Sequence, residues 1–207
     1  MAPGLDLTFL SREITDSKAS TLHHQPFLLA TATQCAGSKV QDPSEIPTDF
    51  DLLRFEGAAF NQLHVEDADD AKDAKPTSTL LISSPYNSEG HFLDLTTLST
   101  PFLLFAKALT ALKPVRPDYA TAEYTKALNF PAILDLLRDF ATQAKYDWKS
   151  QTFYVVVFRS KLKEGIDSQL LYSLDCESHR EACESGGLLK YWFGAPDAER
   201  RNLATCE

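Results

Sequence analysis

The chain has 207 residues, which bounds it to one domain or to one domain with an appendage. Hydrophobic residues make up 43% and charged residues 24%, and these values exclude collagen-like, coiled-coil and wholly disordered chains. The sequence contains 20 Lys and Arg against 29 Asp and Glu, which gives a net charge of −9. This acidic balance argues against nucleic acid and against a membrane surface as partners.

Residues 1–90 are expected to form an irregular N-terminal segment. Within it, residues 27–32 and 79–83 are rich in apolar and β-branched types and predict two short strands. Apolar residues at helical spacing over Phe50–Leu63 predict a helix that is weakest at Gly57. The run EDADDAKDAK at residues 66–75 predicts an exposed, flexible acidic loop, with a docking tail or a metal site as alternatives.

Residues 91–148 are expected to be mainly helical. Ser99 and Pro101 suit a helix start, and the apolar residues that follow as far as Leu112 form one broad face. A short helix is predicted over Tyr119–Leu128, with Asp118 or Thr121 as its cap. Asn129 then precedes apolar residues at three- and four-residue steps, which predicts an amphipathic helix that reaches about residue 144.

The C-terminal part carries the clearest pattern of alternating elements. Phe153–Phe158 predicts a strand buried on both faces, because its residues are β-branched or aromatic without polar alternation. The capping-box pattern of Ser178 and Glu181 predicts a short helix over 178–185, ended by two glycines. Two more strands are predicted, at 188–193 and 203–206.

This order predicts an α+β fold in which residues 91–207 form one domain with a ferredoxin-like, dimeric α/β-barrel-like sheet unit. Such a unit requires a further helix and a last strand. The predicted sheet unit is therefore incomplete, as a C-terminally truncated domain would be. A partner chain or the N-terminal segment would then supply the missing layer.

The strings Leu93–Pro101, Phe153–Leu162, Ser185–Gly194 and Arg201–Cys206 resemble the signature strings of a fungal family, uncharacterised protein family 0643. The resemblance covers residues 90–206 well and the first part of the chain loosely. It implies a fungal source and a C-terminal extension with another helix and strand. It carries over no activity, cofactor or site residue.

The cysteines and the N-terminus bear on compartment and cofactors. Cys35, Cys176, Cys183 and Cys206 form no CxxC pair and match no zinc pattern, so neither a metal nor another cofactor is predicted. The N-terminus lacks a basic stretch followed by an apolar one, and no apolar run reaches the ~18–20 residues of a membrane span. A soluble, cytoplasmic protein with reduced thiols is expected, with the nucleus as a further location.

His179 and Cys176 are the first candidates for catalysis. His179 lies in the polar stretch DCESHR, where neighbouring carboxylates would support a general base. The ordinary alternative is an exposed histidine in the first turn of a helix. Cys176 and Cys183 allow a Cys–His nucleophile. A helix N-terminus would lower the pKa of the Cys176 thiol. The alternative, which is commoner in proteins, is that these thiols are buried and structural.

Arg159 and an aromatic triplet are candidates for binding. Arg159 ends an apolar strand and would hold a carboxylate or phenolate, or otherwise form a salt bridge. Strand alternation places Tyr191 and Phe193 on one face and Trp192 on the other. One face is expected in the core, and the other in an apolar ligand pocket or a dimer interface. His91 is isolated in the sequence from other ligand-type residues, as are His23 and His24.

Three functions are compatible with these observations. The first is an α+β protein that forms a homodimer through its sheet or binds a small apolar ligand. The second is a cofactor-independent enzyme, similar to monooxygenases or cyclases, with Arg159 and His179 as the polar groups of an apolar pocket. The third is an inactive, truncated relative. An enclosed cavity with these residues on its wall would favour the enzyme over the other two.

Overall fold

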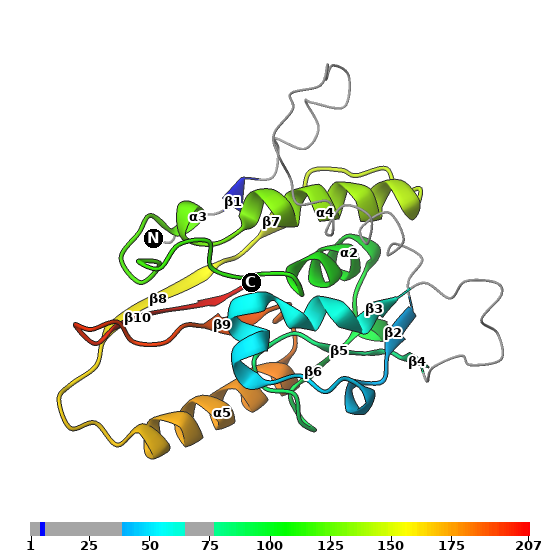
Figure 1. Cartoon of the computed structure of the whole chain (residues 1–207). Coiled ribbons are helices and arrows are strands. Elements are labelled where there is room, and N and C mark those ends of the chain that lie inside the picture. Colours follow the sequence, from blue (N-terminus) through cyan, green and yellow to red (C-terminus); the bar gives the residue numbers. More distant parts are fainter. Residues whose placement is uncertain (1–4, 7–38, 65–76) are drawn as a thin grey trace.

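The computed structural model describes residues 5–6, 39–64 and 77–207 (Figure 1). Several predictions fall outside these residues: the strand at 27–32, the acidic loop at 66–75, Cys35, His23 and His24. In chain order the larger elements are β2 (Lys39–Gln41), β5 (Leu80–Ile82), β6 (Phe92–Asp94), α2 (Thr100–Leu109), α3 (Tyr124–Ala127), α4 (Phe130–Gln143), β8 (Val156–Lys161), α5 (Ser168–Ser185), β9 (Tyr191–Phe193) and β10 (Arg201–Cys206).

Smaller elements complete the description of the chain. The minor strands are β1 (Leu5–Asp6), β3 (Leu63–His64), β4 (Thr77–Ser78) and β7 (Thr152–Phe153). The short helical turns are η2 (Pro43–Glu45), η3 (Leu52–Glu56), η4 (Ala58–Gln62) and η5 (Leu95–Thr97). In the described part of the chain, no helix is both long and apolar enough to cross a membrane.

The largest antiparallel sheet has the strand order β8–β10–β9. All six residues of β10 pair with β8, and its last three also pair with β9, which places β10 between the two strands that α5 connects. The predicted order strand–helix–strand–turn–strand is therefore confirmed. The sheets of the described residues are small and do not close into a barrel. The α+β class is thus confirmed, and the ferredoxin-like, barrel-like assignment is not.

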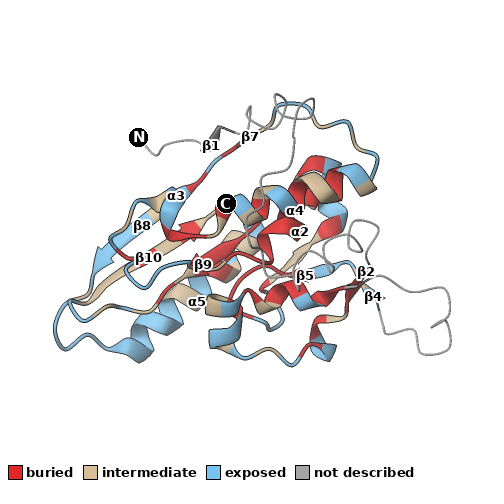
Figure 2. Cartoon of the chain, turned by 45° about the horizontal axis from the view of Figure 1, so that its top comes forward, coloured by how far each residue is buried: buried red, intermediate tan, exposed pale blue. Residues whose placement is uncertain are grey.

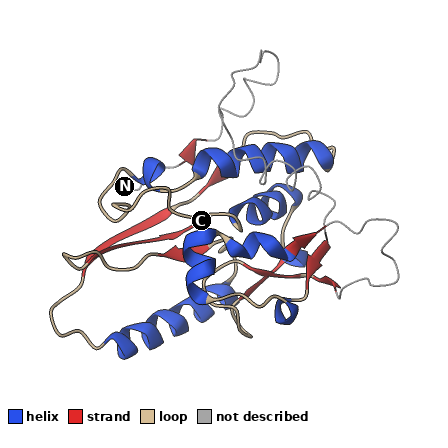
Figure 3. Cartoon of the chain, in the orientation of Figure 1, coloured by secondary structure: helices blue, strands red, loops and turns tan. Residues whose placement is uncertain are grey.

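Helices lie on both sides of this sheet (Figures 1 and 3). On one side α2 packs against α4, and their buried residues form one core with Trp192 and Leu203 of the sheet. On the other side lies α5, which is mostly exposed apart from His179 (Figure 2). The two faces of the sheet therefore differ, since one is filled by apolar side chains and the other is only partly covered.

The predicted helices α2 and α4 are confirmed. Both follow from local signals in the sequence. Pro101 and Pro131 stand in the first turns, where no backbone donor is needed. The middle helix is shorter than predicted and begins after Glu123 rather than after Asp118 or Thr121. The predicted helix at 50–63 forms two short turns, η3 and η4, on either side of Gly57 (φ 65°).

Two predictions for the C-terminal part are wrong. β8 is an edge strand, and the side chains of Val156 and Phe158 are 47% and 52% exposed, so the strand is not buried on both faces. The helix predicted at 178–185 begins ten residues earlier, at Ser168. Asp167 caps this helix, because its carboxylate accepts hydrogen bonds from the backbone N–H groups of Gln169 and Leu170. These two donors have no acceptor within the helix. The helix does end at Gly186, as predicted.

Candidate functional site

A cavity of about 540 Å³ lies between α5 and the sheet face opposite the main core. Phe158, Tyr191 and Phe193 line it from the strands, and Tyr172 and Asp175 line it from α5. The wall is mainly apolar and aromatic by area, and its polar members include His179, Asn202 and three serines. This composition and size are those of a typical small-molecule site.

Strand alternation decides which aromatic side chains reach the cavity. Tyr191 and Phe193 both line it, whereas Trp192 points to the opposite face and is fully buried. The indole Nε1 of Trp192 donates a hydrogen bond to the backbone oxygen of Arg54 at 2.6 Å, and its ring meets Tyr119 edge-on. The predicted alternation is therefore confirmed. Of the two binding candidates, Tyr191 lines the cavity and Trp192 belongs to the core.

Asp175 holds two tyrosines at the inner wall of the cavity. The hydroxyl of Tyr86 donates to Oδ2 of Asp175 at 2.5 Å, and the hydroxyl of Tyr191 donates to Oδ1 at 2.6 Å. Burial raises the pKa of both phenols, and the neighbouring carboxylate adds to the effect. Both phenols are therefore neutral donors. They link α5 to β9 and to the turn between β5 and β6.

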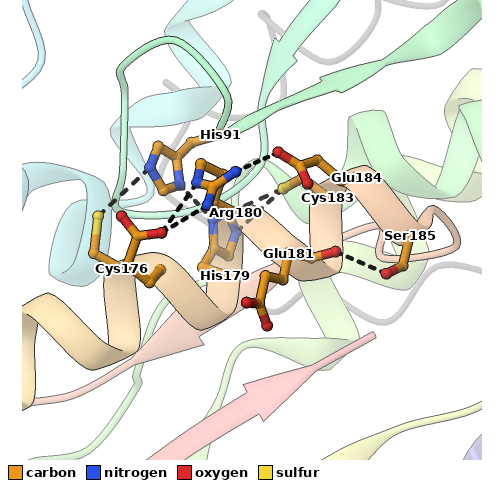
Figure 4. Close-up of polar contacts among 9 residues, drawn as sticks. His91, Cys176, His179, Arg180, Glu181, Cys183, Glu184 and Ser185 are labelled. Atoms are coloured by element: carbon orange, nitrogen blue, oxygen red, sulfur yellow. Dashed lines mark hydrogen bonds and ion pairs between the residues drawn. The ribbon is translucent and has the colours of Figure 1, made fainter.

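His179 of α5 pairs with His91, which lies in the turn between β5 and β6 (Figure 4). Its Nδ1 lies 2.8 Å from the Nδ1 of His91, and the two rings are stacked at 15°. Both side chains are buried, at 4% and 5% exposure. Burial lowers the pKa of His179 to about 4, with a further contribution from His91, and burial also lowers the pKa of His91. The expectations of an exposed first-turn His179 and of an isolated His91 are therefore wrong.

Two thiols extend the histidine pair at either end. Cys176 Sγ lies 3.5 Å from His91 Nε2, and Cys183 Sγ lies 3.8 Å from both ring nitrogens of His179. These contacts follow one another as a chain and do not converge on one point. Among the described residues, no three His, Cys, Asp or Glu side chains form a group that could hold a metal ion.

The environment of these thiols does not favour a nucleophile. Burial raises the pKa of Cys176 and of Cys183, and neighbouring carboxylates act in the same direction. Cys176 lies in the middle of α5 and far from its N-terminus, so the predicted lowering of its pKa is wrong. The thiols remain protonated at neutral pH, which suits a packing role better than nucleophilic attack.

Arg159 lies outside the cavity. Its guanidinium donates to the backbone oxygen of Ala120 at 2.6 Å and to that of Ala122. These partners belong to the segment before α3, so the structure ties Arg159 to a loop and separates it from His179. Of the two polar groups that the enzyme hypothesis requires, His179 lines the cavity and Arg159 does not.

Sequence reasoning missed Asp175, Tyr86 and His91 as members of this site. Asp175 and His179 are four residues apart and share a face of α5, a relation that appears only when the helix is known to begin at Ser168. Tyr86 and His91 come from a turn almost ninety positions earlier in the chain. No local signal in that turn indicates its partners.

Comparisons with known proteins bear on the part of the chain that forms the cavity. No solved structure matches the chain at a significant level. UPF0643 protein PB2B2.08 of Schizosaccharomyces pombe is 38% identical over 143 residues, and this chain spans 64% of that relative's length. The model of the PB2B2.08-like family matches residues 82–207, which include α5 and all strands of the largest sheet. The chain therefore belongs to the PB2B2.08-like family, which confirms the fungal family resemblance of its sequence.

Proposed function

We propose that this protein binds a small, largely apolar molecule in the cavity between α5 and the sheet. The cavity itself carries the proposal, because its volume of about 540 Å³ and its aromatic lining match those of ligand sites. Tyr86, Tyr191 and Asp175 fix one another by hydrogen bonds and so hold a rigid polar end. Rigid polar groups in an apolar wall give a ligand its orientation.

Binding is proposed ahead of the enzyme alternative for a chemical reason. Arg159 lies outside the cavity, and His179 has its Nδ1 engaged by His91. The protonated thiols supply no nucleophile at neutral pH. What remains at the cavity wall is a set of fixed hydrogen-bonding groups, which suits recognition of a ligand.

A cavity-filling substitution tests this proposal. Ala204 stands on the central strand β10 and lines the cavity, so Ala204→Phe fills the space from its floor. Indole-3-ethanol is a suitable neutral probe, since it is small, aromatic and carries one hydroxyl. We expect ligand-observed NMR to show that it binds the wild type and loses at least about tenfold in affinity for Ala204→Phe.

The control is Ala198→Phe, an equal change at an exposed turn position outside the cavity lining. It should retain the wild-type affinity for indole-3-ethanol. Cooperative thermal unfolding of both variants checks that each is folded. Equal affinities of the wild type and Ala204→Phe contradict the proposal.

A second candidate function is homodimer formation through the sheet, supported by the edge of β8. Within the described residues β8 pairs with β10 alone, and its outer edge is free to pair with another strand. Val156, the first residue of β8, is 47% exposed, and Tyr154, two residues before it, is 88% exposed. The order β8–β10–β9, with α5 between the outer strands, also supports the ferredoxin-like proposal, in which a fourth strand joins this same edge.

Light scattering coupled to size exclusion tests the homodimer. The wild type is expected to have the mass of two chains, and Val156→Lys, which places a charge at the edge, the mass of one. Lys149→Arg, at an exposed position outside the sheet, is the control and should leave the mass unchanged. A monomeric wild type contradicts this second proposal and leaves the ligand proposal intact.

A further inference from the structure

Asp175 contributes a carboxylate to the cavity wall, and none of the described residues gives it a cationic partner. Of the described residues that line the cavity, it is the only one with a carboxylate. Its hydrogen bonds from Tyr86 and Tyr191 come from neutral phenols, and in the described part of the chain no ion pair includes it. A half-buried carboxylate gains free energy when a positive charge joins it, because the surrounding protein screens the pair less than water does.

Among the described residues that line the cavity, one has a cationic side chain, and this side chain is already engaged elsewhere. Arg54 pairs with Asp51, donates to the backbone oxygen of Gly194 at 3.3 Å, and lies over the ring of Phe193 with 5.3 Å to the centroid. Its guanidinium also lies 4.8 Å from the ring centroid of Phe50. The guanidinium of Arg54 therefore already has an anionic partner in Asp51, although its buried Nε donates to none of the described residues. Asp175 is left for a ligand to neutralise.

The aromatic lining favours the same kind of ligand. Tyr86, Tyr172, Tyr191 and Phe193 surround the region of Asp175, with ring centroids 5.6–6.0 Å apart for the neighbouring pairs Tyr86–Tyr172, Tyr86–Phe193 and Tyr191–Phe193. The faces of such rings carry partial negative charge and attract cations. The net charge of −9 also raises the local concentration of cations around the protein.

We infer that the ligand of this cavity is an organic amine, whose ammonium group pairs with Asp175 while its apolar body contacts the aromatic wall. The inference rests on the proposed binding function and names the ligand class for it. The ammonium N–H groups donate to the lone pairs of Asp175 that the two phenols leave free. The phenols hold the carboxylate in place, so the ligand meets a preorganised partner.

Two probes of the same shape test the charge. Tryptamine and indole-3-ethanol share the indole ring and the two-carbon chain, and they differ in an ammonium group against a hydroxyl at pH 7. We expect ligand-observed NMR titrations of the wild type to give a Kd for tryptamine about tenfold or more below that for indole-3-ethanol. Added sodium chloride should reduce this difference.

The variant Asp175→Asn keeps the size of the side chain and removes its charge. It should bring the two Kd values within about twofold of one another, whereas Glu181→Gln, an equal change at an exposed position of α5, should keep the wild-type difference. The wild-type titrations decide the question even where Asp175→Asn does not fold. Equal Kd values in the wild type overturn the amine inference and leave the binding function standing. Absence of binding by both probes overturns the two together.

Discussion

The Nδ1 atoms of His91 and His179 lie 2.8 Å apart, a distance at which one of them donates a hydrogen to the other. When both rings are protonated, two N–H groups face each other and the contact becomes repulsive. The pair therefore accepts one additional proton and resists a second. This bond ties the middle of α5 to the residue before β6, so the protonation state of the rings is linked to the attachment of the helix.

This linkage predicts a pH-dependent stability. The pKa of His179 is lowered from an ordinary value of 6.5 to about 4, so the unfolded chain binds more protons than the folded one between these values. The contribution of His179 to the free energy of unfolding is complete above pH 6.5 and is lost as the pH falls towards 4. It amounts to about 3 kcal/mol at most. Denaturant titrations at several pH values measure it through the free energy of unfolding.

His179→Gln removes the titrating group and keeps a side chain that forms hydrogen bonds. Its stability should fall less steeply between pH 6.5 and 4 than that of the wild type. The carboxylates that titrate in the same range are common to both proteins, so the difference between the two curves reports the histidine pair. Parallel curves would show that His179 does not contribute to the pH dependence.

A second prediction concerns the hydrogen bond from Tyr191 to Asp175, which is 2.6 Å long. Tyr191→Phe should lower the free energy of unfolding by about 1.5–3 kcal/mol, because the bond has a carboxylate as its acceptor. Tyr172→Phe is the control, since Tyr172 lines the same wall and its side chain is half-exposed, and it should change the stability by less than about 0.5 kcal/mol.

A double-mutant cycle with Asp175→Asn separates this bond from other effects of the substitutions. The effects of Tyr191→Phe and Asp175→Asn should fall short of additivity by about 1 kcal/mol, since the first removes the donor of this hydrogen bond and the second removes the charge of its acceptor. Additive effects would mean that the hydrogen bond does not contribute to stability, and that the tyrosine acts through packing alone.

The sequence predicts the helices best where their signals are local. α2 and α4 follow from amphipathic spacing and from Pro101 and Pro131 in their first turns. The predicted start of α5 is ten residues too late, because the pattern of Ser178 and Glu181, typical of a helix start, occurs here inside a helix. The cap is Asp167, which lies in a polar stretch without a strong periodic signal around it.

The candidate site depends on contacts that one sequence does not reveal. The strand pattern indicates Tyr191 and the polar neighbours indicate His179, but the partners of both residues lie far away in the chain. His91 is 88 positions from His179, and Tyr86 is 89 positions from Asp175. These pairs form because the turn between β5 and β6 lies against α5, and this arrangement is decided by the packing of the whole domain.

Two glycines allow a third prediction that separates backbone strain from steric contact. Gly57 and Gly165 have nearly equal φ values, 65° and 67°, which a side chain disfavours. A Cβ on Gly57 would lie 2.8 Å from the backbone oxygen of Ala111, whereas a Cβ on Gly165 would meet nothing within 4 Å. Gly165→Ala should therefore cost about 1 kcal/mol, and Gly57→Ala at least about 1 kcal/mol more. Equal losses in thermal or denaturant unfolding would show that the segment after α2 moves freely away from η3.

The last prediction compares Trp192 and Trp148. Substitution by Phe removes a hydrogen bond at Trp192, whereas at Trp148 it removes none that the described residues form. Trp192 is fully buried and its Nε1 donates to the backbone oxygen of Arg54. The Nε1 of Trp148 is also buried, but none of the described residues accepts its hydrogen. Trp192→Phe should lower the free energy of unfolding by about 2–4 kcal/mol, because it leaves a void and removes the hydrogen bond to Arg54.

Trp148→Phe loses ring volume at a half-buried position and removes an unpaired donor, so its cost should be below about 1 kcal/mol. Denaturant unfolding followed by circular dichroism compares the two variants without relying on tryptophan fluorescence. Neither substitution touches the cavity wall, so the affinity for indole-3-ethanol should stay within about twofold of the wild type in both. If Trp192→Phe alone weakened binding, the core face of the sheet would be coupled to the cavity face through β9, and the two faces could not be treated as independent.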